Sequence, residues 1–69
     1  MQYMKRKYKV VDLMEHKETI GYANTIDEIK KIAKVRYEDT DGYCSVFYYP
    51  LNKETNKYDF NKRKFLETF

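Results

Sequence analysis

Short stretches in which apolar residues recur between polar ones predict four β-strands. Residues 7–14 are rich in Tyr and Val, and a polar break separates them from a second apolar run at residues 19–23, which predicts an antiparallel hairpin. Residues 43–49 carry the strongest strand pattern. Because proline cannot donate to a central ladder, we expect that strand either to end at Pro50 or to have its end at a sheet edge. A polar turn then leads to a fourth strand at residues 57–61.

Between the second and third strands, the spacing of apolar residues changes to that of a helix. Thr25 and Glu28 have the spacing of a capping box, in which Glu28 is expected to reach back to the Thr25 amide. One face of the helix collects Ile26, Ile29, Ile32 and Ala33, while lysines fall on the opposite side. The acids after Arg36 are unfavourable at a helix C-terminus, so we expect the helix to end near residues 36–38, followed by a turn at Gly42.

The predicted order is therefore β-β-α-β-β, an α+β fold with one helix packed on an antiparallel four-stranded sheet. A chain of 69 residues has room for one small domain, which covers residues 1–69. Residues 62–69 are expected either to dock as a short helical tail that includes Phe65, Leu66 and Phe69, or to fray.

The number of aromatic side chains gives the main functional hypothesis. The chain has eight Tyr and four Phe, and one helix can cover only one face of the sheet. We therefore expect rings to stay exposed on the second face, where they would form a partner-binding surface edged by cations. The predicted binding residues are Tyr43, Phe47, Tyr49, Tyr58, Lys7, Lys9 and Lys57. If so, Phe47→Ala and Tyr49→Ala should leave the fold intact and abolish binding; the alternatives are that the tail covers this face or that the tyrosines are simply solvated.

Catalytic and metal chemistry find little support in the residues. His16 and Cys44 are the only His and Cys, which is too few for an ordinary zinc site, and nothing in the pattern brings them together. The two glycines cannot form a phosphate-cradling loop. We therefore expect no enzyme activity, no metal and no cofactor.

Charge and cysteine content bear on partners and compartment. The formal net charge is +3, and the first eleven residues carry four cations and no acid. If the cations of residues 5–7 and 62–64 converge, they would attract phosphate, so nucleic-acid binding is the alternative function. The other interpretation is that they are flanking charges that keep the protein soluble. The single Cys excludes an internal disulfide, and no apolar run is long enough for a signal peptide or a membrane span, which predicts a cytoplasmic protein.

The stretch Ile-Gly-Tyr-Ala-Asn-Thr-Ile-Asp-Glu-Ile-Lys-Lys-Ile-Ala at residues 20–33, in Lys-, Asn- and Tyr-rich surroundings, resembles small proteins carried by phages and mobile elements of Gram-positive bacteria. This resemblance implies stoichiometric binding to a host protein, including defence nucleases, as an anti-CRISPR-like protein would do. The leading hypothesis is a non-catalytic binding protein that docks on a host protein or nucleoprotein and inhibits it. A third interpretation is a homodimer that buries the second sheet face.

Overall fold

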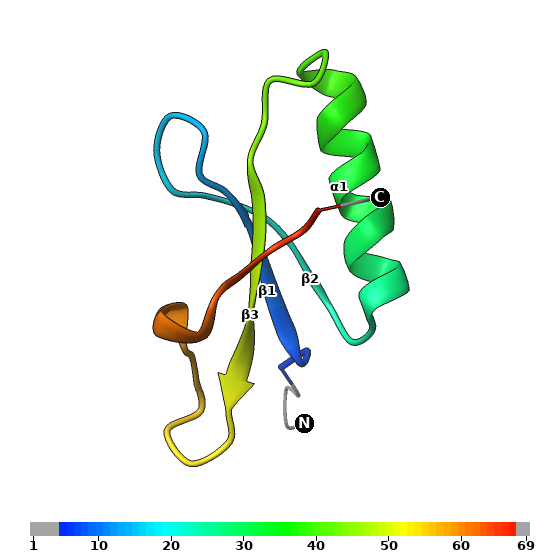
Figure 1. The fold of residues 1–69 in the computed structure, drawn as a ribbon. Coiled ribbons are helices and arrows are strands. Elements are labelled where there is room, and N and C mark those ends of the chain that lie inside the picture. Colours follow the sequence, from blue (N-terminus) through cyan, green and yellow to red (C-terminus); the bar gives the residue numbers. More distant parts are fainter. Residues whose placement is uncertain (1–4, 68–69) are drawn as a thin grey trace.

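The computed structural model describes residues 5–67, in which one helix packs against a curled antiparallel sheet (Figure 1). The elements in chain order are β1 (Tyr8–Asp12), β2 (Glu18–Ala23), α1 (Ile26–Asp39), β3 (Val46–Asn52), β4 (Lys57–Tyr58), the 3-10 helix η1 (Phe60–Lys62) and β5 (Lys64–Phe65). The predicted α+β fold and its β-β-α-β-β order are confirmed. The predicted fourth strand is shorter than expected, and a fifth strand follows it, because η1 interrupts the sheet edge after Tyr58.

Strand β3 lies in the interior of the sheet. Its strand order is β2-β1-β3-β4, and β5 also pairs with β3. One edge of β3 pairs with β1 along its length, with Val10 opposite Tyr48. The other edge is shared: Leu51 faces Tyr58 of β4, and Phe47 faces Phe65 of β5. Both edges of β3 are therefore occupied.

The expectation that Pro50 ends the third strand is wrong, since β3 continues through it to Asn52. The Pro50 carbonyl accepts a hydrogen bond from the Asp59 amide at 2.9 Å. Because the N and O of one strand residue point to the same edge, the proline nitrogen faces the interval between β4 and β5. At that interval η1 replaces the ladder, so the missing donor costs no strand hydrogen bond.

The main core lies between the sheet and α1. Its buried members are Val10, Ala23, Ile29, Ala33, Val46 and Leu66. Helix α1 approaches β2 closely at Gly21, where a Cβ would lie 2.9 Å from Cδ1 of Ile32. A glycine in this strand therefore brings the helix and sheet together.

Both ends of α1 follow from the sequence, with small differences from the prediction. The Thr25 hydroxyl accepts from the Glu28 amide at 3.2 Å, but Glu28 reaches back to the Asn24 amide (3.4 Å) instead of that of Thr25. The helix runs to Asp39, one residue beyond the predicted range. Gly42 then takes a φ of +85°, as a turn glycine should, and its amide donates to the Tyr37 carbonyl.

The C-terminal segment differs from both of its predicted states. It is neither a helical tail nor frayed: residues 64–65 join the sheet edge, and Leu66 enters the helix-side core. The predicted docking of Phe69 lies outside the described residues. No helix in the described part of the chain is long and apolar enough to cross a membrane.

Candidate binding surface

The second face of the sheet has a buried centre. Val11 is fully buried there, and only 1% of Tyr49 is exposed. The rings of Tyr58 and Phe60 pack edge-on against the Tyr49 ring, with centroids at 6.4 and 5.3 Å. Lys17 completes the cover, with its Nζ 4.5 Å from the centroid of Phe60. The prediction that Tyr49 is a surface residue is therefore wrong, because η1 and the β1–β2 loop cover it.

Covering Tyr49 also removes its hydroxyl from water. Among the described residues, it is the buried side-chain polar atom without a hydrogen-bond partner. Burial raises the pKa of Tyr49, and the nearby Tyr22 adds to the effect. The phenol therefore stays neutral and acts as a core ring.

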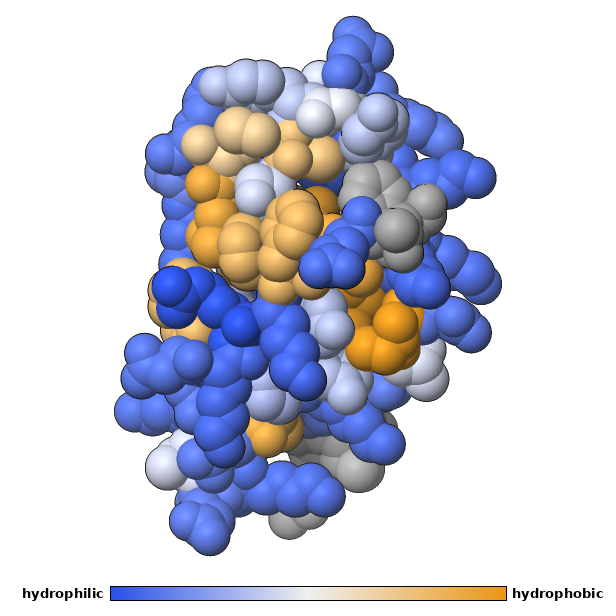
Figure 2. All heavy atoms as spheres, in the orientation of Figure 1, coloured by the Kyte–Doolittle hydropathy of each residue, from blue (hydrophilic) through white to orange (hydrophobic). Residues whose placement is uncertain are grey.

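Around this buried centre, other rings stay exposed. Tyr22 on β2 is 45% exposed and contacts the ring of Tyr58, with centroids 5.6 Å apart. Phe65 on β5 is 53% exposed and contacts Phe47 on β3 at 5.3 Å. We call these four residues, Tyr22, Phe47, Tyr58 and Phe65, the aromatic surface. Figure 2 shows hydrophobic side chains gathered over β5 and the first half of β3, whereas hydrophilic side chains cover the lower half of this view.

Cations border the Tyr22 end of the aromatic surface. Lys5, Arg6 and Lys9 line a hollow of about 320 Å³ together with Tyr22 and Tyr58. Lys9 lies opposite Tyr22 in the strand pairing. The hollow therefore combines aromatic rings with positive charge.

Two hydrogen bonds hold this hollow in shape. The Tyr58 hydroxyl donates to the Arg6 carbonyl at 2.6 Å, and Lys5 Nζ donates to the Asn56 carbonyl at 2.8 Å. Arg6 also forms an ion pair with Glu28 at 3.2 Å, between two largely exposed side chains. Within residues 5–67, no acidic side chain lines the hollow itself, and the Glu28 carboxylate offsets the charge of Arg6 but not that of Lys5 or Lys9.

The structure brings only some of the predicted binding residues together. Phe47, Tyr58 and Lys9 share the second face, whereas Lys57 pairs with Asn52 and thus points to the opposite face from its neighbour Tyr58. Lys7 extends the β1–β3 ladder through its carbonyl, which accepts from Leu51. The sequence-based prediction missed Tyr22 and Phe65. The pairing of β1 with β2 places Tyr22 on the second face, opposite Lys9, but this register could be predicted only by knowing of the bulge between Val10 and Val11.

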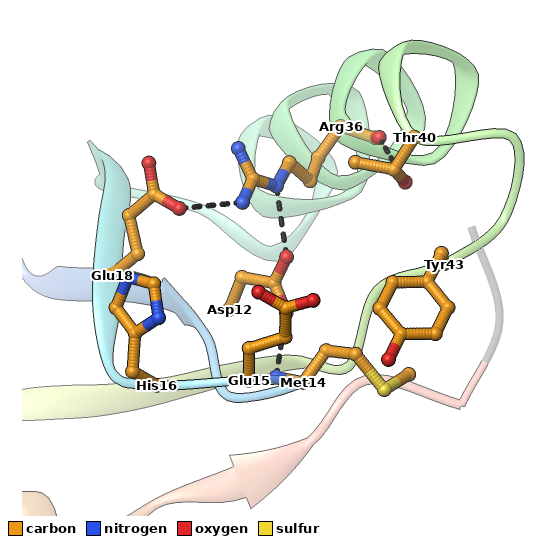
Figure 3. A pocket seen from close by; sticks show the side chains of 8 residues that line it. All are labelled: Asp12, Met14, Glu15, His16, Glu18, Arg36, Thr40 and Tyr43. Atoms are coloured by element: carbon orange, nitrogen blue, oxygen red, sulfur yellow. Dashed lines mark hydrogen bonds and ion pairs between the residues drawn. The ribbon is translucent and has the colours of Figure 1, made fainter.

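Tyr43 is exposed, but it lies apart from the aromatic surface. Strand β3 begins at Val46, so Tyr43 belongs to the loop after α1. There it lines a polar hollow of about 200 Å³ with Asp12, His16 and Arg36 (Figure 3). Its predicted place on the second face is therefore wrong.

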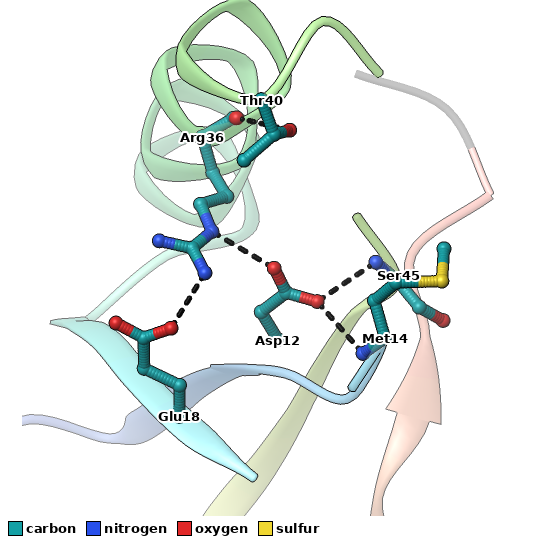
Figure 4. Close-up of polar contacts among 6 residues, drawn as sticks. All are labelled: Asp12, Met14, Glu18, Arg36, Thr40 and Ser45. Atoms are coloured by element: carbon teal, nitrogen blue, oxygen red, sulfur yellow. Dashed lines mark hydrogen bonds and ion pairs between the residues drawn. The ribbon is translucent and has the colours of Figure 1, made fainter. Parts of the chain in front are cut away.

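An internal ionic network occupies one wall of this polar hollow (Figure 4). Asp12 accepts from Arg36 Nε at 2.8 Å and from the amides of Ser45 (2.9 Å) and Met14 (3.0 Å). Arg36 also donates to Glu18 at 2.6 Å. Burial acts to raise the pKa of Asp12, but the two amides and Arg36 outweigh it and hold that pKa below its usual value. These groups satisfy one another, which fits a structural role.

The candidates for nucleophilic or metal chemistry stay dispersed. His16 lines the polar hollow, whereas Cys44 packs against the main core. Within residues 5–67, no three His, Cys, Asp or Glu side chains are grouped to hold a metal ion.

No known protein family, curated protein or solved structure matches the chain.

Proposed function

We propose that the chain is a non-catalytic binding protein that docks on a partner protein or nucleoprotein through the aromatic surface. The observation that carries this proposal is the exposure of Tyr22 and Phe65 after the rest of the second face has been covered. Tyrosine and phenylalanine are enriched in the cores of protein interfaces, where a few buried anchor residues contribute most of the affinity. When a partner covers rings that are exposed to water, the burial of their apolar surface makes the free energy of binding more favourable.

The charge around the rings indicates what the partner offers. Lys5, Arg6 and Lys9 border the Tyr22 end, so an acidic patch on the partner would match them. The resemblance to phage and mobile-element proteins supports a host protein of a Gram-positive bacterium as this partner, with inhibition as the result of docking.

The test is affinity capture with substitutions in the aromatic surface. The tagged chain is incubated with nuclease-treated extract of a Gram-positive bacterium, and the retained proteins are identified by mass spectrometry. We expect Tyr22→Ala combined with Phe65→Ala to lose a protein that the wild type retains, because both rings are contact residues. Circular dichroism should confirm that this variant keeps its fold.

Tyr43→Ala is the matched control. Tyr43 is 58% exposed but lies outside the aromatic surface, so its truncation should leave capture unchanged. Equal retention by the double variant and the wild type would contradict the proposal. A protein that the wild type retains from untreated extract but not from nuclease-treated extract would instead indicate that a nucleic acid bridges the two.

A further inference from the structure

A second hollow lies on the helix side of the sheet. It has a volume of about 500 Å³ and is bounded by the start of α1, by β3 and by the segment from η1 to β5. In Figure 1, η1 lies to one side of β3 and the first turn of α1 to the other. We call it the Tyr8–Tyr48 cleft.

The floor of this cleft is aromatic. Tyr8 and Tyr48 meet edge to face, with centroids 5.8 Å apart and an interplanar angle of 81°. Pro50 extends the floor, and Ile26, at the first helical position, forms an apolar wall with 39% of its surface exposed. Both tyrosines are only half-buried, so part of the floor is accessible to solvent.

The rim of the cleft is basic. Lys62, Arg63 and Lys64 all line it. The Arg63 guanidinium, however, is turned to Phe60: its Nη1 donates to the Phe60 carbonyl at 3.1 Å, and the group lies 4.4 Å from the Phe60 centroid. The cations available to a ligand in the cleft are therefore Lys62 and Lys64. Within residues 5–67, no ion pair engages Lys62 or Lys64.

Among residues 5–67, no acidic side chain lines this cleft. Glu54 and Asp59 line a different hollow, which shares Pro50 and Lys62 with the cleft. Lys64 lies opposite Tyr48 in the strand pairing, so its side chain leaves the sheet on the same face as the Tyr48 ring. Lysine side chains and tyrosine rings therefore line the same cleft.

The sheet topology restricts what can occupy the cleft. A peptide commonly binds a sheet by adding a strand to a free edge. Strand β3 offers no such edge here, because β1 pairs with one side and β4 and β5 with the other. Tyrosine rings beside two lysines instead match single-stranded nucleic acid, whose bases pack on aromatic side chains while lysines neutralise its phosphates.

We propose that the Tyr8–Tyr48 cleft binds single-stranded nucleic acid, with bases against the Tyr8, Tyr48 and Ile26 side chains and phosphates at Lys62 and Lys64. This site is separate from the aromatic surface and does not depend on it. A partner that is a nucleoprotein would engage both.

The experiment measures fluorescence anisotropy of a labelled thymidine oligonucleotide of about eight nucleotides, which lies within the span of one small binding domain. Titrations at about 50 and 200 mM salt separate charge from ring contacts. We expect Lys62→Glu combined with Lys64→Glu to weaken binding by about tenfold or more and to reduce its salt dependence, since two phosphate contacts are lost.

Two further variants make the result specific to the cleft. Lys30→Glu with Lys31→Glu makes the same charge change on exposed positions of α1 and should shift affinity much less. Ile26→Ala should weaken binding several-fold while leaving the salt dependence unchanged, because it removes an apolar contact and no charge. Tyr22→Ala should have no effect, which distinguishes this site from the aromatic surface.

Four outcomes would overturn the proposal. They are absence of binding by the wild type at the lower salt concentration, equal losses in the two lysine pairs, no effect of Ile26→Ala, and equal affinity for an oligoglutamate of matched charge. Circular dichroism of each variant establishes that a loss of binding is not a loss of fold.

Discussion

Asp12 shows how a single residue can connect three parts of this small chain. Only 3% of it is exposed, and it is the buried charged side chain among residues 5–67. Its carboxylate binds Arg36 of α1, the Ser45 amide ahead of β3 and the Met14 amide beyond β1. These contacts close the end of the sheet against the helix, since a buried carboxylate is tolerated only when its acceptors are used.

We expect Asp12→Asn to lower the free energy of unfolding at neutral pH by about 2–3 kcal/mol, because the charge partner of Arg36 is removed. The pKa of Asp12 is lowered in the folded state from its ordinary value of 3.8. Its contribution is therefore complete above that pH and is lost as the pH falls through the folded-state value.

Urea unfolding at several pH values checks this prediction. The difference between wild type and Asp12→Asn should be largest above about pH 5 and should shrink towards about pH 2. Glu15→Gln, an exposed acid of the same hollow, serves as the control and should show little difference. A pH-independent difference would show that the charge of Asp12 does not stabilise the fold.

Tyr49 carries the opposite expectation. Its buried hydroxyl lacks a partner, so Tyr49→Phe should raise the free energy of unfolding by about 1 kcal/mol. Tyr49→Ala should instead cost about 3–5 kcal/mol by opening a cavity, in contrast to the expectation of an intact fold drawn from the sequence. Thermal unfolding measures both, with the exposed Tyr43→Phe as the unchanged reference; a lower stability of Tyr49→Phe would contradict this account of the hydroxyl.

At the scale of elements, the two-residue strand β5 holds the segment after η1 against the sheet by pairing with β3. Phe65 and Leu66 are neighbours in sequence but point to opposite faces. Phe65 contacts Phe47 and stays half-exposed, whereas Leu66 is 6% exposed within the main core. The amide of Leu66 also donates to the Val46 carbonyl at 2.9 Å.

This difference predicts unequal effects of two adjacent truncations. Leu66→Ala should lower the free energy of unfolding by about 2–4 kcal/mol, because it empties a core position. Phe65→Ala should cost about 1 kcal/mol or less, since half of that ring already lies in water. Chemical denaturation of both variants tests the pair, and similar losses would show that Phe65 belongs to the core.

The elements with strong local patterns were predictable from the sequence. Helix α1 has both a capping residue and an apolar stripe, and its start was correct. The sequence predicts that β3 begins three residues too early, because Tyr43 and Cys44 extend the strand-like pattern of residues 46–49 towards the N-terminus. In the fold, the Ser45 amide donates to the Asp12 side chain, and the pairing of β3 with β1 begins at the next residue, Val46. A contact between residues so far apart in the sequence leaves no local pattern.

At the scale of the whole molecule, the number of aromatic residues predicts exposed rings on the second face of the sheet, but it does not predict which rings are exposed. One helix does cover only one face, and rings do remain exposed on the other. However, η1 and Lys17 cover Tyr49, so the exposed rings lie around this centre instead of at it. The sequence could not indicate this, because the position of η1 depends on how β4 and β5 share one edge of β3.

The positions of the two basic segments in the fold are only partly predictable from their positions in the sequence. From the sequence, the cations of residues 5–7 and 62–64 either converge into one phosphate-attracting cluster or act as separate flanking charges. In the structure they are separate: Lys5 and Arg6 line a hollow on the second face, and residues 62–64 line one on the helix side. This separation is why the two proposed sites can be tested with different substitutions.

Pro50 has a consequence for how the strands find their alignment during folding. The proline nitrogen costs the sheet no hydrogen bond only in the observed register, in which it faces η1. If β3 slipped by one position along β1, the proline would turn towards β1, and a carbonyl of that strand would lose its donor in the middle of the sheet. A single imino acid thus penalises the nearest wrong pairing of a strand whose aromatic residues would otherwise suit either side.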